Sequence, residues 1–535
     1  MSLGLDLGTG LAKLARYPTG TGPPAVTAVP TAVAYRDDLS REIPVGTGDG
    51  LARPDVVRCD GFVPVLGTSL SASRITAWRN LTPDEAVQGF LRCLIGMVDG
   101  EPGPGPAAAP AELVVAVPAA WLGEQDAASE LAEALTTLGW PPRRLVAAPV
   151  AALLQLRHED PDLARASRFV VADAGAGSVD LSLVTATGPR LRVTDSIRLV
   201  GRSAWTDDTQ PDVPGNRPPT LAECLVTALA AAAGAPRASM PGRESVRRWR
   251  ALESELADDA RRDRLEAVLQ QAAADRYRHG GTMALRFAGL EVTASQFLDA
   301  CDPLAARAGA ALGQLLSRQA EPGWSPAGVG DHPRLVLLGG LTGLSPLREA
   351  VLAALGLDPD RPADGLVQPG GTDRLSVTAR GAALLAAGQA DPGDRYPHEL
   401  RLQVSRVLMD RMVTEYLQLA APGVIDLDDS RVRYLTAPGG TGHGGELQVT
   451  VRAAADQPDA PPVPVQIIPA DGEMVPVAFQ AVPHPAPGVY RVGVRGGPDG
   501  PAVILQRTDG GQVLTYPLTA DADPAAAGHA MRMHR

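Results

Sequence analysis

Two short segments of the chain share a pattern in which an aspartate is followed by a glycine-rich turn. Both segments read D-x-G-x-G, the first from Asp6 and the second from Asp173. Glycine in such a turn lets backbone N–H groups approach a phosphate, because no Cβ stands in the way. An aspartate at the end of the preceding strand can hold a hydrated Mg²⁺ against the same phosphate, because hard cations prefer carboxylate and water oxygens. The pattern therefore indicates a site for Mg²⁺ and a phosphate-bearing ligand.

Both turns supply candidate ligands for such a site. The candidates for phosphate binding are Gly8, Thr9 and Gly10 in the first turn and Gly175, Gly177 and Ser178 in the second. Lys13 follows the first turn and is the only lysine among 49 lysine and arginine residues, and its ammonium group suits phosphate oxygens. Asp180 stands at the same offset after the second aspartate. The site is thus expected to have a basic side at Lys13 and an acidic, metal-facing side.

Each turn lies between two short apolar runs that are typical of a β-hairpin. The runs are Leu3–Leu7 and Leu11–Arg16 around the first turn, and Phe169–Asp173 and Ser178–Val184 around the second. Taken alone, a single D-x-G-x-G more often marks an ordinary hairpin turn. The repetition predicts a duplicated domain with two facing hairpins, although two short matches also arise by chance in a glycine-rich chain. The D-x-G-x-G turn is not the dinucleotide-binding fingerprint, which needs the spacing G-x-G-x-x-G at the start of a helix, and no Walker-type loop is present in the sequence.

Strand and helix patterns alternate along the rest of the first 390 residues. A buried strand is expected at Leu113–Pro118 and a helix at Gln125–Leu138, and a second buried strand at Arg334–Leu338 precedes the glycine pair that opens the next helix. A further helix, Ser376–Ala387, is rich in small residues, and its Gly381 is expected to permit close packing. Alternating strands and helices predict an α/β architecture.

The composition changes near residue 390, where a polar segment containing glycine and proline predicts a linker over residues 391–398. Beyond it, short alternating runs separated by turns predict an all-β sandwich of about six or seven strands over residues 399–518. Residues 519–535 are alanine-rich and are expected to be a flexible tail. The predicted domains are therefore residues 1–390 and 399–518.

Composition excludes several classes of protein. The formal net charge is −12, whereas a general nucleic-acid binder is expected to be basic. The four cysteines lie far apart, which favours neither a disulfide scaffold nor a zinc site. The longest uncharged apolar run, Cys224–Ala235, is too short to cross a bilayer, and the first residues do not read as a secretory signal. We therefore expect a cytoplasmic protein with neither nucleic acid nor membrane as a partner.

The order of these segments resembles the actin-like ATPase superfamily and, within it, the seventy-kilodalton heat-shock chaperones. Segments similar to the family's motifs occur in the family's order at Gly4–Ala15, Val29–Tyr35, Val114–Gly139, Arg143–Leu156, Phe169–Val184, Leu335–Leu352 and Ser376–Gly388. The resemblance covers about residues 1–390. It implies a duplicated, ribonuclease H-like ATPase domain with one lobe at about 1–165 and 360–390 and the other at about 166–359.

The same resemblance implies ATP or ADP with Mg²⁺ as the bound ligands. Asp6 and Asp173 are expected to contact the metal or its waters, and Asp173 and Asp180 are the candidate catalytic carboxylates. Gly339 and Gly340 are expected to line the adenosine side of the site. Gly201 is a further candidate there.

The sequence also departs from the family pattern at places that matter for catalysis. Ala148 stands where the family carries a glutamate or glutamine that positions the attacking water. Alanines occupy expected adenine-contact positions within Gln270–Arg278, where Arg276 or Arg278 is an alternative stacking residue, and Leu341 follows the glycine pair where the family has a polar residue. Loss of a group that positions water and handles protons often costs a factor of about 10² to 10⁴ in rate. We therefore expect nucleotide binding with weak or slow hydrolysis.

These expectations lead to two alternative functions. The first is an ATP-binding, chaperone-like protein in which nucleotide-dependent closure of the lobes is coupled to binding of client or partner proteins. The second is a non-hydrolysing pseudo-ATPase scaffold that recruits partners through its β-sandwich. The β region has no long helical lid after its strands and looks more like an immunoglobulin-type module than the family's peptide-binding sandwich.

Overall fold

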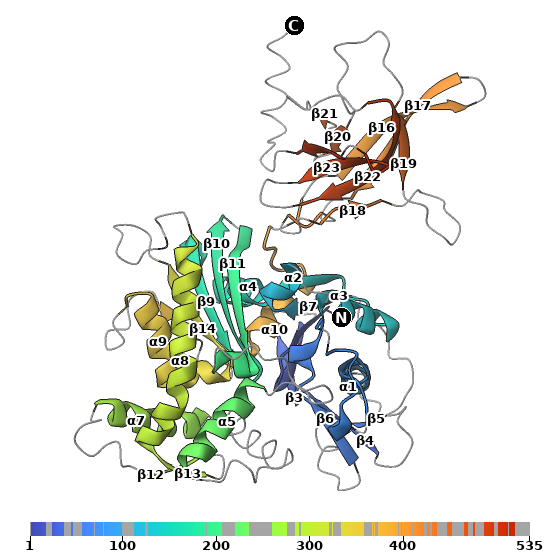
Figure 1. Cartoon of the computed structure of the whole chain (residues 1–535). Helices are drawn as coiled ribbons and strands as arrows, with labels where there is room; N and C mark the ends of the chain where they lie inside the picture. The colour runs from blue at the N-terminus through green and yellow to red at the C-terminus, as the bar shows by residue number, and fades with distance from the viewer. Residues whose placement is uncertain are drawn as a thin grey trace. The chain divides into compact units, whose positions relative to one another are not determined.

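The computed structural model of the 535-residue chain divides into two compact units, Met1–Asp391 and Pro392–Arg535 (Figure 1). The structure describes residues 2–17, 24–36, 44–46, 56–68, 70–78, 80–98, 112–123, 127–188, 190–205, 220–234, 259–274, 284–287, 290–319, 324, 333–357, 366–367, 369, 373–393, 395–396, 399–408, 411–421, 425–427, 431–435, 447–451, 465–468, 475–476, 486–496, 501–511 and 513–518. Among these residues, no helix is both long and apolar enough to cross a membrane.

The first unit contains a five-stranded sheet with the strand order β3-β2-β1-β7-β8. The strands are β1 (Ser2–Leu7), β2 (Leu11–Tyr17), β3 (Ala25–Pro30), β7 (Glu112–Val117) and β8 (Arg144–Ala147). Strand β2 pairs antiparallel with both β1 and β3, whereas β1, β7 and β8 run parallel to one another. The predicted hairpin at the first glycine turn is therefore the β1–β2 pair.

A second five-stranded sheet has the order β11-β10-β9-β14-β15. Its strands are β9 (Arg168–Ala174), β10 (Ser178–Thr187), β11 (Arg190–Val200), β14 (Arg334–Leu338) and β15 (Leu366–Val367). The first three are again antiparallel, and β9, β14 and β15 are parallel. When the strands of each sheet are numbered in chain order, the two sheets share the same order and the same strand directions.

Helices cover the outer face of each sheet (Figure 1). Helices α1 (Pro83–Val98) and α3 (Ala127–Thr137) share a buried apolar cluster with the first sheet. Helices α5 (Leu221–Ala232), α8 (Ala294–Ser317) and α9 (Ser345–Ala354) share another with the second sheet. The smaller elements of this unit are β4 (Ala32–Arg36), β5 (Pro44–Gly46), β6 (Val56–Asp60), α2 (Ala119–Gly123), α7 (Asp259–Ala274), β12 (Ala284–Phe287) and β13 (Leu290–Thr293).

Two helices pack against each other between the sheets, α4 (Ala148–Glu159) and α10 (Asp373–Ala386). Their apolar side chains join strands of both sheets in a third buried cluster. A Cβ atom on Gly381 would overlap the carbonyl oxygen of Ala151, and one on Gly4 of β1 would overlap the backbone of α10. Close backbone approach at these two glycines is therefore what lets α10 lie against both α4 and β1, as predicted for Gly381.

The structure confirms the predicted α/β class and extends the list of elements. The strand expected at Leu113–Pro118 is β7, and the small-residue helix expected at Ser376–Ala387 is α10. Helix α8 was not among the predicted elements; Pro303 lies within it, and a proline in a helical pattern usually indicates a helix boundary. Its first turn is fixed by reciprocal hydrogen bonds between Thr293 and Gln296.

The second unit consists of antiparallel strands. One sheet has the order β17-β16-β20-β21, and in the other β18, β22, β23 and β24 follow one another while β19 also pairs with β22. The strands are β16 (Glu399–Leu408), β17 (Arg411–Ala420), β18 (Arg433–Tyr434), β19 (Gln448–Val451), β20 (Val465–Ile468), β21 (Val475–Pro476), β22 (Gly488–Arg495), β23 (Ala502–Arg507) and β24 (Val513–Pro517). Side chains of both sheets form one buried cluster.

The predicted linker contributes to this second unit. Tyr396 is buried in its core, and its backbone N–H donates to the carbonyl of Ile425. Arg395 forms an ion pair with Asp426, with the Nη2 and Oδ2 atoms 3.4 Å apart. The predicted tail, residues 519–535, lies outside the described part of the chain.

Candidate functional site

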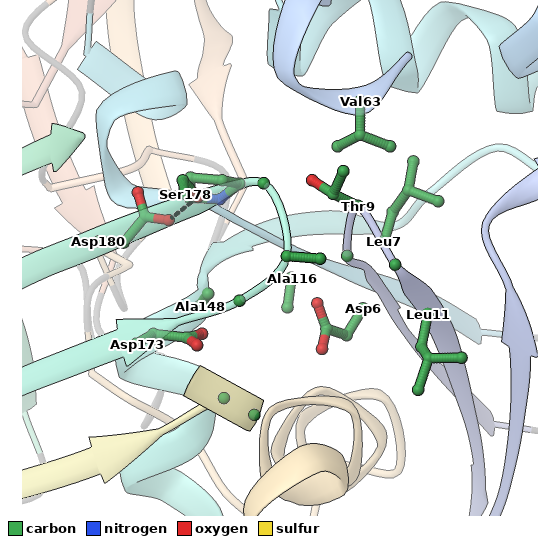
Figure 2. A pocket seen from close by; sticks show the side chains of 18 of the residues that line it. Asp6, Leu7, Thr9, Leu11, Val63, Ala116, Ala148, Asp173, Ser178 and Asp180 are labelled. Carbon is green, nitrogen blue, oxygen red and sulfur yellow. Dashed lines mark hydrogen bonds between the residues drawn. The ribbon is translucent and has the colours of Figure 1, made fainter. Parts of the chain in front are cut away.

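The two glycine turns meet at one pocket of the first unit (Figure 2). The predicted residues that line this pocket are Asp6, Gly8, Thr9, Gly10, Lys13, Asp173, Gly175, Gly177, Ser178, Asp180, Gly339 and Gly340. Figure 2 shows the carboxylates of Asp6 and Asp173 directed into the same space between the turns. One turn belongs to the hairpin of the first sheet and the other to the hairpin of the second sheet. The pocket therefore brings together residues that are far apart in the sequence.

The first turn touches the second through Thr9, which is buried. A Cβ atom on Gly177 would overlap the Oγ1 atom of Thr9, so a side chain at Gly177 would force the turns apart. The first turn is fixed from behind by Thr31, whose Oγ1 donates to the carbonyl of Gly8 over 2.7 Å and whose N–H donates to that of Gly10 over 2.9 Å. Thr31 was not predicted, because it acts on the turn from another segment.

The second turn is closed by a hydrogen bond from the N–H of Gly175 to the carbonyl of Ser178, 2.9 Å long. The N–H of Ala222, in the first turn of α5, donates to the carbonyl of Ala176. Gly201 does not line the pocket: its N–H lies 3.4 Å from the carbonyl of Gly177, on the side of the turn next to the end of β11. Gly201 thus supports the turn from outside the pocket.

The two hairpins have the same register, which fixes the charge across each pair of strands. Lys13 stands opposite Asp6 in the first hairpin, and Asp180 stands opposite Asp173 in the second. The ammonium group of Lys13 lies 3.0 Å from Oδ2 of Asp6, and both side chains are more than four-fifths buried. The charge of Lys13 is therefore paired with Asp6, in addition to facing the pocket.

Asp173 lies among other carboxylates. Burial raises its pKa to about 7, and the negative charges of Asp6 and Asp180 add to this, while Lys13 and Arg198 act in the opposite direction. A raised pKa means that the ionised carboxylate lacks sufficient compensating positive charge in the protein alone. A bound cation would supply it.

The donor set of the pocket suits a metal held through water and phosphate oxygens. Within the described parts of the chain, no group of three or more His, Cys, Asp or Glu side chains is arranged to hold a metal ion directly. Mg²⁺ usually keeps several waters and is bound by one or two carboxylates together with substrate phosphates. Asp6 and Asp173 provide such carboxylates on opposite sides of the pocket.

Arg198 of β11 also lines the pocket and was not predicted. It stands opposite Asp180 in the sheet, and its Nε atom lies 3.6 Å from Oδ1 of Asp180. The Oγ of Ser178 donates to the other carboxylate oxygen, Oδ2, over 2.6 Å. Nearly all the basic residues of this chain are arginines, so the sequence does not indicate which arginine lies at the site. The pairing of Arg198 with Asp180 in the sheet is what places it there.

Helix α4 begins at the pocket, which Ala148 and Pro149 line. No side chain caps the first turn of this helix. Peptide dipoles place partial positive charge at a helix N-terminus, which favours an anion there. Ala148, the position where the family resemblance implies a water-orienting acid, thus carries only a methyl group. The acidic residues that line the described pocket are Asp6, Asp173 and Asp180.

The predicted adenosine side lies where β14 ends. Gly339 has a φ of +79°, and a Cβ atom there would lie 2.5 Å from Oδ1 of Asp173, so the position favours glycine both for its backbone and for space. Leu341 and Leu375 line the pocket beside the glycine pair. No described residue of α7 lines it, and Arg276 and Arg278 lie outside the described residues.

No family model matches the sequence, and no curated protein matches it.

Proposed function

We propose that the first unit binds an adenine nucleotide with Mg²⁺, ATP or ADP, in the pocket between the two glycine turns. The observation that supports this most strongly is the contact of Thr9 with Gly177, which brings both turns to one pocket that also holds Asp6 and Asp173. Backbone N–H groups from two sides and carboxylates between them match the chemistry of a Mg²⁺–polyphosphate.

The topology supports a divergent actin-like, duplicated ATPase domain as the fold of this unit. Both sheets have the same strand order and strand directions, and α4 and α10 join them in a shared buried cluster. In such an arrangement the two halves can move apart or close on a ligand that the turns of both sheets bind. The ligand stabilises the closed form to the extent that it binds this form more tightly than the open one.

Each group of the pocket has a distinct part in this proposal. The turns from Gly8 to Gly10 and from Gly175 to Ser178 bind phosphate oxygens through backbone N–H groups other than that of Gly175, which donates to Ser178. Asp6 and Asp173 accept hydrogen bonds from the metal's waters. Mg²⁺ supplies neutralisation of the phosphate charge when it is bound. Gly339 gives the nucleoside close access to the backbone beside Asp173.

Ala148 makes nucleotide binding with slow turnover the expected behaviour. With a methyl group at the start of α4, the protein has no carboxylate there to orient water or accept its proton. The nucleotide then acts mainly as a switch that closes the unit, and a chaperone-like role with client or partner proteins remains our first functional proposal. Ala148 equally favours the second, a pseudo-ATPase scaffold that recruits partners through its second unit.

Calorimetric titration of the full chain with ATP and with ADP, in the presence and absence of Mg²⁺, tests the proposal. We expect one site per chain, Mg²⁺-dependent binding, and weaker binding in Lys13→Ala, because that change removes an ammonium group that faces the phosphate oxygens and leaves the carboxylates to repel them. A nucleotide at 100 times its Kd should stabilise the protein by about 2.7 kcal/mol. Absence of binding at millimolar nucleotide would refute it.

Phosphate release separates the two functions. Slow release above the protein-free baseline, abolished by Asp173→Asn, supports a weak ATPase. Release that stays at the baseline in a protein that binds ATP supports the scaffold.

A further inference from the structure

Two cationic side chains line the described pocket, and their surroundings differ. Lys13 lies 3.0 Å from a carboxylate oxygen of Asp6, which is hydrogen-bonding distance. Arg198 lies 3.6 Å from Asp180, which is beyond the usual range of an N–H···O bond. Asp180 is in turn hydrogen-bonded to Ser178 through its other oxygen. The guanidinium of Arg198 is therefore near a negative charge without being fully engaged by it.

The Arg198 side chain is also nine-tenths buried, with 10% of its surface exposed. Its Nη1 atom is buried and has no hydrogen-bond partner among the described residues. Leaving a buried donor unsatisfied is unfavourable, and more so for a charged group. A ligand oxygen at this place would remove that cost.

The guanidinium is held in position by Trp121 of α2. Its Cζ atom lies 5.2 Å from the centre of the indole ring, which is within the range of a cation–π contact. Trp121 belongs to the half of the unit built on the first sheet, whereas Arg198 belongs to the second sheet. The contact with Trp121 holds the guanidinium N–H groups of Arg198 beside the pocket. The side chain therefore loses less conformational entropy when the guanidinium binds an oxyanion.

The strand order places Arg198 away from the adenosine side. Strands β10 and β9 lie between β11, which carries Arg198, and β14, which precedes Gly339. Neighbouring strands are about 4.8 Å apart, so three spacings separate the two ends of the pocket along the sheet. A nucleotide with its nucleoside at Gly339 and its first phosphates at the turns has its terminal phosphate directed toward β11.

The start of α4 also lines the pocket. Its uncapped first turn, at Ala148, presents the positive end of a 12-residue helix. An acidic side chain at Ala148 would oppose an anion here, and the alanine does not.

We propose that Arg198 binds the terminal phosphate of ATP and makes the pocket select the triphosphate over the diphosphate. The inference rests on the proposed nucleotide binding. The Nη1–H group of Arg198 donates to an oxygen of the terminal phosphate. The guanidinium also supplies positive charge next to the additional phosphate group that ATP has and ADP lacks.

The test is the ratio of ATP to ADP affinity, measured by calorimetric titration of the full chain with Mg²⁺ present. In Arg198→Gln we expect ATP binding to weaken by about 10- to 100-fold, in the range of one charge-assisted hydrogen bond, while ADP affinity stays within about twofold. Arg198→Lys should lie between the wild-type and the glutamine variant, because it restores the charge without the fork. Arg192→Gln, on the same strand but outside the pocket lining, is the matched control and should change neither affinity.

The outcomes separate this inference from the proposed function. Wild-type protein that binds neither nucleotide refutes both. Wild-type protein that binds both nucleotides, with a ratio unchanged in Arg198→Gln, refutes the role of Arg198 alone. An equal loss of ATP and ADP affinity also contradicts it, because the side chain would then serve the whole site and not the terminal phosphate. Retained ADP binding shows in the same experiment that the variant is folded.

Discussion

Gly177 lies against Thr9 so closely that any side chain at Gly177 would overlap the threonine hydroxyl. Thr9 belongs to the turn of the first sheet and Gly177 to that of the second. Their contact is one of the places where the two halves of the first unit meet, and both residues line the pocket that holds Asp6 and Asp173. The glycine therefore sets how far the pocket can close.

Gly177→Ala is expected to lower the affinity for Mg²⁺-ATP by about tenfold or more, because misplacing the turns by a fraction of an ångström weakens contacts made from both sides. Gly177→Ala should cause a smaller loss of Mg²⁺-ATP affinity in a protein that already carries Thr9→Gly, because Thr9→Gly removes the atoms that the new methyl group would overlap. A calorimetric double-mutant cycle measures this coupling. Additive losses would show that the two turns act independently.

Thermal unfolding of the free protein provides a matched control for the same contact. A Cβ atom at Gly175 meets nothing within 4 Å, so Gly175→Ala should leave the melting temperature nearly unchanged while Gly177→Ala lowers it. Equal melting temperatures for the two variants would contradict a close contact at Gly177.

Packing between α4 and α10 depends on Gly381. Gly381→Ala is expected to destabilise the first unit by about 1–3 kcal/mol, because the new methyl group would overlap the carbonyl oxygen of Ala151. Gly313→Ala in α8 is the control: its Cβ atom meets nothing within 4 Å, and the change should stabilise the helix by about 0.5–1 kcal/mol. Chemical denaturation measures both, and a neutral Gly381→Ala would contradict the packing.

Asp173 gives the free protein a pH dependence of stability. Its pKa in the folded state is about 7 and its ordinary value is 3.8, so the folded state binds more protons between these values. Stability contributed at this site is therefore highest at low pH and decreases as the pH rises from about 4 to about 7. Asp173→Asn removes this decrease.

Melting temperatures of wild-type and Asp173→Asn protein, compared from about pH 4 to about pH 8 without ligand, measure the effect. The variant should gain stability relative to the wild type as the pH rises, and should lose Mg²⁺-dependent nucleotide binding. A difference in melting temperature that is constant across this range would contradict the crowding of carboxylates around Asp173.

Ala148 accounts for slow turnover in the proposed function. Ala148→Glu places a carboxylate at the start of α4, and phosphate release from Mg²⁺-ATP should rise by about 10²-fold or more if water positioning is the missing element. Ala148→Gln is the control, because it can orient water but cannot accept its proton. Unchanged release in both variants would show that another position limits the reaction.

The sequence alone predicted the parts of the site that depend on residue type at short range. The turns at Gly8 and Gly177 and the carboxylates Asp6 and Asp173 could be identified because a glycine turn after an aspartate is a local pattern. Lys13 was predicted for phosphate, and its ion pair with Asp6 follows from the antiparallel register, which the sequence leaves open.

Residues that reach the site only through tertiary contacts could not be predicted from local sequence patterns. Thr31 supports the first turn from a later segment, and Arg198 reaches the pocket because β11 pairs with β10. A chain whose basic residues are almost all arginine gives no sign of which arginine lies in a pocket. In the second unit, strand β17 was not predicted, since charged residues interrupt its apolar alternation at Arg411 and Glu415.

Hydrogen exchange at the two turns tests the central claim most directly. With selectively labelled glycine, NMR can follow the amides of Gly8, Gly10, Gly175 and Gly177 with and without Mg²⁺-ATP. We predict that nucleotide slows exchange at both turns over the same range of ligand concentration, because one polyphosphate binds both. Saturating nucleotide that protects only one turn, or neither, would contradict the account.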